Sequence, residues 1–332
     1  MAMKRLFIVG CPRSGTTWTL MLLAQHPGTV AAQHVGFFHS LRHLEDWWHE
    51  HQKRKQGGFG KAVVSVAKEG EGAEKGVKFE EIIDEGRFYA MCRRAADDLF
   101  AGILERRPDA EVLVEKTPEN VRIAPFIAKV YPDAYFLHIV RDPRAVYASL
   151  KSAVKTFEKT ASFPGNPIAG ARFWEDDVSR GVAIPEVSDR YLEVRYESLL
   201  SNGEAELARI YEWLGVPVDA AFCAKAVEAA SMKNLRKIEN APKNFFRRGE
   251  ADGWKEELTP EEIRILEYML GDWLDRLGYE RSLGTDVKKP VKVALEQQLQ
   301  STVNRIERTL VRTARRFGYV IPIKPKPHRK GR

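Results

Sequence analysis

No apolar run in the sequence approaches the roughly 20 residues that a helix needs to cross a bilayer, so we expect no membrane-spanning segment. The N-terminal residues MAMKRLFIVG pass directly into a strand-like run, without a hydrophobic segment that ends in a small-residue cleavage site. With 44% hydrophobic and 30% charged residues, the composition is typical of a globular protein. These features predict a cytoplasmic location.

Cysteine is scarce. The three cysteines, Cys11, Cys92 and Cys223, lie far apart and match no spacing that is typical of metal ligands. Their small number and wide separation argue against a disulfide framework, and reduced thiols are the simplest interpretation.

Acidic residues are rare in one part of the chain only. Residues 285–332 contain thirteen Lys or Arg and three Asp or Glu, a charge of +10, whereas the whole chain has a charge of +7. The rest of the chain therefore has a net charge of −3. Contact with a membrane surface or a polyanion is accordingly expected of this tail alone.

Short apolar runs alternate with helical patterns along the chain. Buried strands are predicted at residues 5–10, 111–116, 134–144 and 191–200. Helices are predicted near residues 14–26, 86–106, 125–132 and 203–215. This alternation predicts an α/β fold of three layers, with a central parallel sheet flanked by helices on both faces. Ligands of such sheets bind outside the carboxyl ends of the strands.

We expect one domain from residue 1 to residue 284 and a helical C-terminal extension at 285–332. Within the domain, residues 51–78 are rich in Gly, Lys and Glu, which predicts a mobile insertion or lid. The aromatic segment FFHSLRHLEDWWH, at residues 37–49, either lines a substrate pocket or belongs to the core.

The loop GCPRSGTTW, at residues 10–18, joins the first strand to the first helix. Its backbone N–H groups and the helix N-terminus can surround one anion, while Thr16 and Thr17 add hydroxyl donors and Arg13 adds a charge. The Lys-Ser/Thr pair that holds Mg²⁺ and the phosphates of ATP or GTP is absent. A phosphate or sulfate site is one interpretation, and a helix start that binds nothing is the other. Trp18 either stacks on a base or belongs to the core.

Two further segments can hold a phosphate. In IVRDPRAVYAS, Arg141 ends a strand and Ser149 follows eight residues later, two turns into a predicted helix. In FFRRGEADGWKEELT, Arg247, Arg248 and the amide of Gly249 can form an anion clamp. The alternatives are an Arg–Asp pair at a helix start for the first segment and a solvated basic loop for the second.

Together, these three segments resemble motifs of the sulfotransferase family, whose donor is 3′-phosphoadenosine-5′-phosphosulfate (PAPS). CPRSGTTW looks like the family's 5′-phosphosulfate loop, and RDPRAVYAS looks like its 3′-phosphate motif. RRGEADGWK is similar to its late Arg-Lys-Gly…Trp-Lys segment, although Arg248 replaces the Lys and DG stands where GD is usual. VRYESLL is similar to the Tyr-Glu-Asp-Leu segment, which suggests that Tyr196 lies near the adenosine. The resemblance covers about residues 4–280 and implies a P-loop-like fold.

The resemblance implies transfer of a sulfuryl group from PAPS to a hydroxyl, or less readily an amine, by in-line displacement that leaves 3′,5′-adenosine bisphosphate. The acceptor is then a carbohydrate, a lipid-linked molecule or a small metabolite, and no metal is expected. The implied donor-binding residues are Arg13, Ser14, Gly15, Thr16, Thr17, Trp18, Arg141, Ser149, Tyr196, Arg247, Arg248 and Gly249.

Arg13, Lys116 and the loop amides are the candidates for stabilising the charge that develops during transfer. Glu115, in VEKTPEN, resembles the base of carbohydrate-type members, and we expect it to remove the acceptor proton; the alternative is that it only pairs with Lys116 or caps the TPEN segment. His34, in AAQHVG, is the rival base, because some bacterial and tyrosyl-protein members have an acid in that region; a structural role is the alternative. His138, within a strand, is expected to pack in the core.

The tail includes VKVALEQQLQSTVNRIERTLVRTARRFG, whose apolar residues recur at helical spacing and whose second half is rich in arginine. It can be a helix packed on its own domain, a helix pair in a homodimer, or an attachment to the inner face of an anionic membrane. Nucleic-acid binding is less favoured, because the tail has no DNA-binding motif. Two other functions compete with sulfuryl transfer: another P-loop enzyme, such as a small-molecule kinase, and a non-catalytic nucleotide-binding protein that recruits a partner through the tail.

Overall fold

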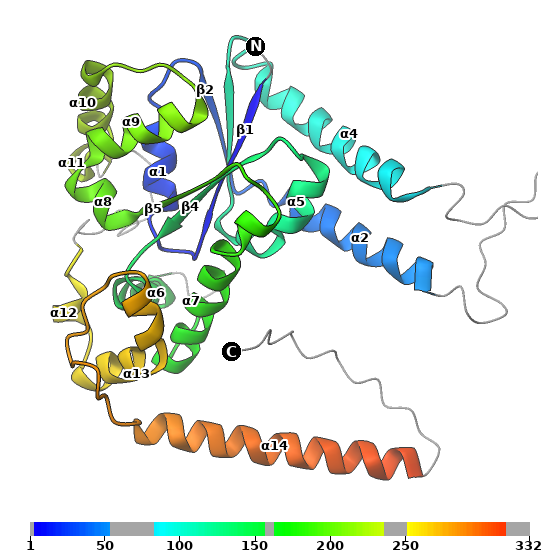
Figure 1. Cartoon of the computed structure of the whole chain (residues 1–332), viewed down its shortest axis with the longest axis vertical. Coiled ribbons are helices and arrows are strands. Elements are labelled where there is room, and N and C mark those ends of the chain that lie inside the picture. Colours follow the sequence, from blue (N-terminus) through cyan, green and yellow to red (C-terminus); the bar gives the residue numbers. More distant parts are fainter. Residues whose placement is uncertain (1–2, 54–82, 157–162, 236–250, 317–332) are drawn as a thin grey trace, which may run out of the picture. The chain divides into compact units, whose positions relative to one another are not determined.

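A five-stranded parallel sheet forms the centre of the fold in the computed structural model of the chain, with the strand order β2-β3-β1-β4-β5 (Figure 1). The structure describes residues 3–53, 83–156, 163–235 and 251–316. The strands are β1 (Lys4–Gly10), β2 (Thr29–Gln33), β3 (Val112–Lys116), β4 (Tyr135–Val140) and β5 (Tyr191–Arg195).

The four predicted strands and the parallel sheet between helical layers are confirmed. The predicted strands at 134–144 and 191–200 are too long. Strand β4 ends at Val140 and helix α6 begins at Pro143, and β5 ends at Arg195 where Tyr196–Ser201 form helix α8. Strand β2 was not predicted, since its sequence TVAAQ contains two alanines and a glutamine, which favour strands weakly. It forms one edge of the sheet beside β3.

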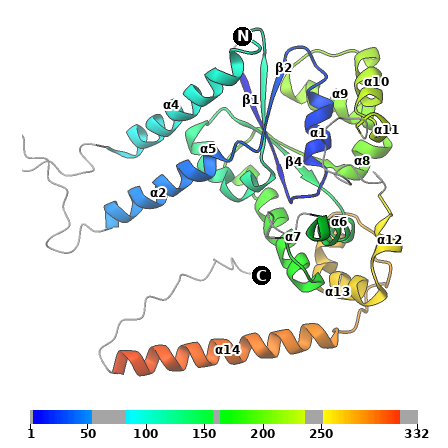
Figure 2. The same ribbon diagram turned by 180° about the vertical axis from the view of Figure 1, so that it is seen from behind.

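Helices cover both faces of the sheet (Figures 1 and 2). One face is covered by α1 (Thr16–Leu23), α8, α9 (Gly203–Leu214) and α10 (Ala220–Ala229), and the other by α2 (Phe37–Lys53), α4 (Glu85–Leu104) and α5 (Ala124–Val130). The remaining elements up to residue 258 are η2 (Pro118–Ile123), α6 (Pro143–Thr156), α7 (Pro167–Gly181), η3 (Ile184–Glu186), α11 (Met232–Leu235) and α12 (Trp254–Glu257).

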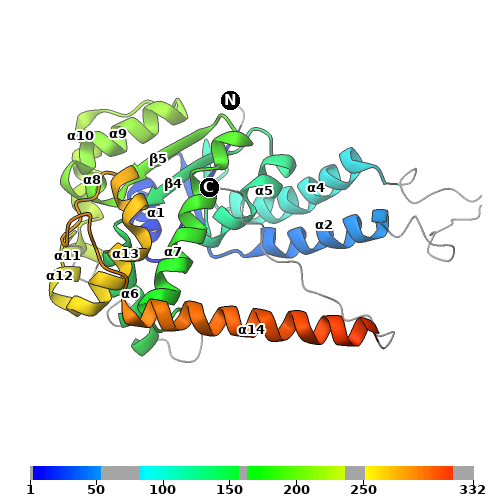
Figure 3. The same ribbon diagram turned by 60° about the horizontal axis from the view of Figure 1, so that its bottom comes forward.

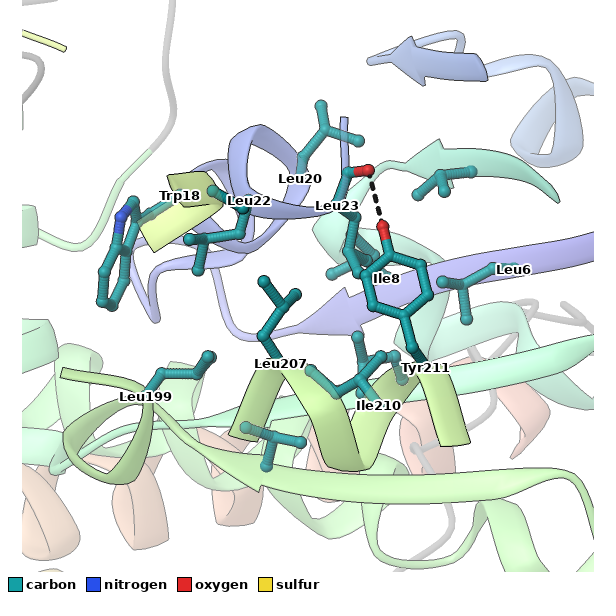
Figure 4. Packing of buried hydrophobic residues seen from close by; sticks show 14 of the residues in the cluster. Leu6, Ile8, Trp18, Leu20, Leu22, Leu23, Leu199, Leu207, Ile210 and Tyr211 are labelled. Carbon is teal, nitrogen blue, oxygen red and sulfur yellow. Dashed lines mark hydrogen bonds between the residues drawn. The ribbon is translucent and has the colours of Figure 1, made fainter. Parts of the chain in front are cut away.

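Strand β1 is apolar on both sides because both helical layers pack on it. Leu6 and Ile8 belong to the cluster beneath α1 and α9, and Phe7 and Val9 belong to the cluster beneath α2, α4 and α5. Figure 4 shows the first cluster, in which the Tyr211 hydroxyl donates to the carbonyl oxygen of Leu23 at 2.9 Å. Helix α1 is thereby fixed to α9, and the loop before α1 is held with it.

The aromatic segment at 37–49 mainly builds the second cluster. Phe38 and Trp48 are buried, and Trp48 stacks on Phe88 of α4 with ring centres 5.0 Å apart. The core interpretation therefore applies to these side chains. His138 is also in the core as expected, with Nδ1 2.9 Å from the Tyr191 hydroxyl, and burial lowers its pKa to about 3.

The chain divides into two compact units, Met1–Leu258 and Thr259–Arg332. The second contains α13 (Pro260–Arg276), which begins with a capping box between Thr259 and Glu262, and α14 (Val291–Arg316), which confirms the predicted tail helix. The domain boundary at residue 284 stays a prediction. So does the lid at 51–78, which lies outside the described residues except for the last turn of α2. Among the helices that the structure describes, none is both long and apolar enough to cross a membrane.

Candidate functional site

The loop between β1 and α1 requires glycine at two positions. Gly10 has a φ of +146°, and a Cβ there would lie 2.5 Å from the carbonyl oxygen of Ile139 in β4. Gly15 has a φ of +98°, and a Cβ there would lie 2.3 Å from the Tyr196 ring. Between them, Arg13 adopts a left-handed φ of 75°. The loop therefore turns tightly against β4 and α8 before α1 begins.

The N-terminus of α1 offers unused donors. Gly15 is its N-cap residue, no side chain in the described part of the chain caps it, and its first turn has no acidic residue. Thr16 and Thr17 are its first two residues, so their N–H groups have no partner within the helix. Ser14 is 0% exposed, and its hydroxyl has no hydrogen-bond partner among the described residues. A tetrahedral anion bound here would accept from these donors.

The second predicted motif lies against this loop. Arg13 Nε donates to Ser149 Oγ at 3.0 Å, and Arg141 Nη1 donates to the carbonyl oxygen of Arg13 at 3.2 Å. The guanidinium carbon of Arg141 lies 4.1 Å from the centre of the Tyr196 ring. The structure thus brings together four of the predicted donor-binding residues, from the loop after β1, the end of β4, α6 and α8. The predicted clamp at residues 247–249 lies outside the described residues.

Near this cluster, two of the structural alternatives to ligand binding are present: Trp18 in the core, and an Arg–Asp pair at the start of α6. Trp18 is 7% exposed and donates from Nε1 to the carbonyl oxygen of Ala230 at 2.9 Å, so its ring belongs to the core shown in Figure 4. Its role as a platform for adenine stays a prediction. The Arg–Asp pair at the start of α6 also exists, but it joins Arg144 to Asp142 at 2.7 Å, while Arg141 contacts the loop.

Lys116 and His34 meet at the carboxyl ends of β3 and β2. The Nζ atom of Lys116 is 2.9 Å from Nε2 of His34, and the backbone N–H of His34 donates to the carbonyl oxygen of Lys116 at 3.0 Å. Burial lowers the pKa of Lys116 to about 8. Burial also lowers the pKa of His34, and the charge of Lys116 lowers it further, so the imidazole is neutral at pH 7. As a whole residue, His34 is exposed.

Glu115 and Lys116 lie on opposite faces of the sheet. Glu115 is in register with Phe7, and Lys116 is in register with Ile8, whose side chains belong to different core clusters. Glu115 is 1% exposed. Although the two residues are adjacent in sequence, only Lys116 lies on the face of β1 that α1 covers.

The carboxylate of Glu115 is fully engaged in hydrogen bonds. It accepts from Thr117 Oγ1 and from Asn120 Nδ2, each at 2.6 Å, and from the backbone N–H groups of Val35 and Thr117. Burial nevertheless raises its pKa to about 7. These bonds tie η2 to the turn that contains His34, which has a left-handed φ of 52°. In this structure, Glu115 therefore lies between η2 and Val35, the residue that follows His34.

One carboxylate near this pair was not singled out from the sequence. Glu119, on η2, is half-buried, and its negative charge opposes the lowering of the pKa of both His34 and Lys116 by burial. It acts in the same way on His39 of α2, whose Nε2 atom is buried without a partner in the described part of the chain. The segment TPEN is the one that Glu115 binds through Thr117 and Asn120, as the capping alternative for Glu115 expects. Glu119 lies near the site because the 3-10 turn η2 starts at Pro118. Among the described residues, no group of three or more His, Cys, Asp and Glu side chains could hold a metal ion.

The sequence is similar to known proteins over most of its length. The nodulation protein NoeE of Sinorhizobium fredii is 26% identical over 295 residues, which cover 83% of this chain and 66% of that protein. Protein-tyrosine sulfotransferase 1 of Danio rerio is 22% identical over 288 residues, which cover 84% of this chain and 73% of that protein. The chain thus spans just under two thirds of the length of the nodulation protein.

Among solved structures, the sulfotransferase domain from the curacin biosynthetic pathway matches with a TM-score of 0.51 at 16% identity, over 84% of this chain and 99% of that domain. This likeness confirms the predicted fold. A family model described as "Sulfotransferase family" matches residues 5–220, well over half of the sequence. The chain belongs to the sulfotransferase family.

Proposed function

We propose that the protein transfers a sulfuryl group from PAPS to a hydroxyl of an acceptor. The observation that carries this proposal is the cluster of Arg13, Arg141 and Ser149 beside the uncapped N-terminus of α1. The unpartnered Ser14 hydroxyl and the N–H groups of α1 suit the 5′-phosphosulfate, and Arg141 with Ser149 suits the 3′-phosphate. Residues 247–249 are proposed to complete the second site. When bound, PAPS supplies the activated sulfuryl group.

We assign removal of the acceptor proton to His34. His34 is an exposed residue, and its lowered pKa leaves the imidazole neutral at pH 7, as a general base must be, whereas the Glu115 carboxylate is buried and accepts hydrogen bonds from Thr117 and Asn120. Glu115 is then a positioning residue. The competing prediction, that Glu115 is the base, is tested by the His34→Ala and Glu115→Gln variants in the Discussion. The lone pair of His34 Nε2 becomes available to the acceptor when Lys116 turns toward the charge of the donor.

Lys116 and Arg13 are proposed to stabilise the negative charge on the leaving phosphate and on the transferring group. Arg13 is close enough for its positive charge to lower the pKa of Lys116 in addition to burial. With a pKa of about 8, Lys116 is still mostly protonated at pH 7. The relative from Danio rerio is named for a protein tyrosine acceptor. For this chain we propose that the acceptor group is a hydroxyl, and we do not specify the molecule that bears it.

Arg141→Ala is expected to weaken the binding of 3′,5′-adenosine bisphosphate by about 10- to 100-fold, which is the loss of charge-assisted hydrogen bonds to one phosphate. Titration calorimetry measures the dissociation constants of the wild-type protein and the variant. Arg190→Ala is the matched control, because Arg190 also lies over a tyrosine ring, 5.0 Å from the centre of Tyr135, but outside the cluster. Equal affinity in the wild-type protein and Arg141→Ala, or equal loss in both variants, contradicts the proposed donor site.

The pH dependence of kcat/KM is expected to be bell-shaped. The rate falls above about pH 8, where Lys116 loses its charge. It also falls at acidic pH, below the lowered pKa of His34, where the imidazole is protonated. Lys116→Arg keeps the charge and should move the alkaline limb to higher pH. An acid limb near pH 7 instead would indicate that Glu115, with its pKa raised to about 7 by burial, is the base.

A further inference from the structure

Helix α14 exposes a continuous row of apolar side chains, here called the apolar stripe. The six residues are Val291, Leu295, Leu299, Val303, Ile306 and Leu310, and between 47% and 72% of each side chain is exposed. The helix has 26 residues and is unbroken in Figure 3. Isolated apolar residues on a surface are ordinary, but a continuous row of six marks an interaction site.

The spacing of the apolar stripe fits a flat partner better than a second helix. Its residues are separated by four, four, four, three and four positions. At about 100° per residue, the stripe therefore spreads over ~120° of the helix surface. A two-helix seam repeats every 3.5 residues and stays narrow, whereas a broad stripe suits a helix that lies on an apolar surface.

The positive charge of the surrounding sequence indicates that the partner is negatively charged. Helix α14 contains six Lys or Arg and two Glu, and residues 285–332 have a charge of +10. Two copies of this tail would bring +10 against +10, which opposes pairing. A bilayer with anionic headgroups attracts the same charge and offers the apolar layer that the stripe requires.

We propose that α14 binds the surface of an anionic lipid bilayer, with the apolar stripe among the acyl chains and the basic residues at the lipid phosphates. The helix is about 39 Å long at 1.5 Å per residue, and it lies in the plane of the interface instead of crossing it. This inference does not depend on sulfuryl transfer, since it rests only on the helix and its charge.

Co-sedimentation of the full-length protein with vesicles tests the inference. We expect binding to vesicles of phosphatidylcholine with about 30% phosphatidylglycerol, little binding to phosphatidylcholine alone, and a decrease as NaCl is raised. Leu299→Glu with Val303→Glu should lower the bound-to-free ratio by about tenfold or more, because it removes apolar contact as well as adding charge. Gln297→Glu with Ser301→Glu, on the other side of the helix, adds the same charge and should lower the ratio by about threefold at most.

Thermal unfolding of each variant shows whether the rest of the protein is intact. Equal binding to neutral and anionic vesicles, or an equal loss in the two double variants, overturns the inference. A dimer in analytical ultracentrifugation that Leu299→Glu with Val303→Glu dissociates, together with no vesicle binding, also overturns it and assigns the apolar stripe to a second copy of the chain. Neither result changes the affinity of the protein for 3′,5′-adenosine bisphosphate. The membrane proposal can therefore fail while the proposed sulfuryl transfer stands, and the reverse also holds.

Discussion

His34→Ala is expected to lower kcat by about 10²- to 10⁴-fold, the range for loss of a general base. The affinity for 3′,5′-adenosine bisphosphate should stay within about threefold of the wild-type value, because His34 contacts Lys116 and not the loop of Arg13. Transfer of labelled sulfate from PAPS to the acceptor found in a screen of phenols, sugars and lipid alcohols gives kcat, and calorimetry gives the affinity. The residual activity should also lose the acid limb of its pH profile.

Glu115→Gln is the matched variant for the rival base. An amide at this position retains the size of the side chain, but its NH₂ group cannot accept a hydrogen bond, so the bond from Asn120 Nδ2 is lost or the one with Thr117 Oγ1 must reverse its direction. We therefore expect a loss of about 1–3 kcal/mol in the free energy of unfolding and a decrease in kcat of no more than about tenfold. If Glu115→Gln lowers kcat by about 10²- to 10⁴-fold and His34→Ala does not, Glu115 is the general base and His34 is not.

Asp142→Ala is expected to lower the free energy of unfolding by about 3–5 kcal/mol, a large part of the stability of an ordinary domain. Arg144 is 3% exposed and its guanidinium donates to both oxygens of Asp142, so the variant removes two charge-assisted hydrogen bonds from a buried positive charge. The guanidinium also lies 4.1 Å from the centre of the Trp254 ring, which fixes it in this position. Urea unfolding followed by circular dichroism measures the change.

Asp176→Ala is the control for this variant. Asp176 pairs with Arg180 at 3.1 Å, and both side chains are about half exposed, at 53% and 44%, so the expected loss is below about 1 kcal/mol. Replacing both buried partners, by Asp142→Leu with Arg144→Met, should recover part of the stability, because no buried charge remains. If Asp142→Ala and Asp176→Ala lower the free energy of unfolding by similar amounts, burial of the Asp142–Arg144 pair does not determine its contribution to stability.

Much of the fold is predictable because it depends on local patterns. The strands that pack on both faces are continuous apolar runs, and such runs can be recognised without knowledge of their partners. Strand β2 is different: its residues have weak preferences, and it pairs because β3 offers a free edge. Likewise, Tyr196 lies within the segment that was expected to be a strand, but α8 begins there, and its ring packs beside Gly15.

The candidate site is predictable in its donor half and only partly in its catalytic half. Arg13, Arg141 and Ser149 meet as expected because Arg13 and Arg141 follow strands that end at the same edge of the sheet, and Ser149 lies on the helix after the second of these strands. The sequence EK suggests two groups acting together, yet the alternation of side chains along β3 separates Glu115 from Lys116. The position of His34 depends on β2 and that of Glu119 on η2, and neither element follows from a local pattern.

The ring of Tyr196 contacts three parts of the donor cluster at once. It packs against Gly15, it lies edge-on to Trp18 at 5.4 Å between ring centres, and it supports the guanidinium of Arg141. The two proposed anion positions are therefore held on one rigid side chain, and the distance between them is fixed. A nucleotide with an anionic group at each end would then meet both positions through one supporting ring.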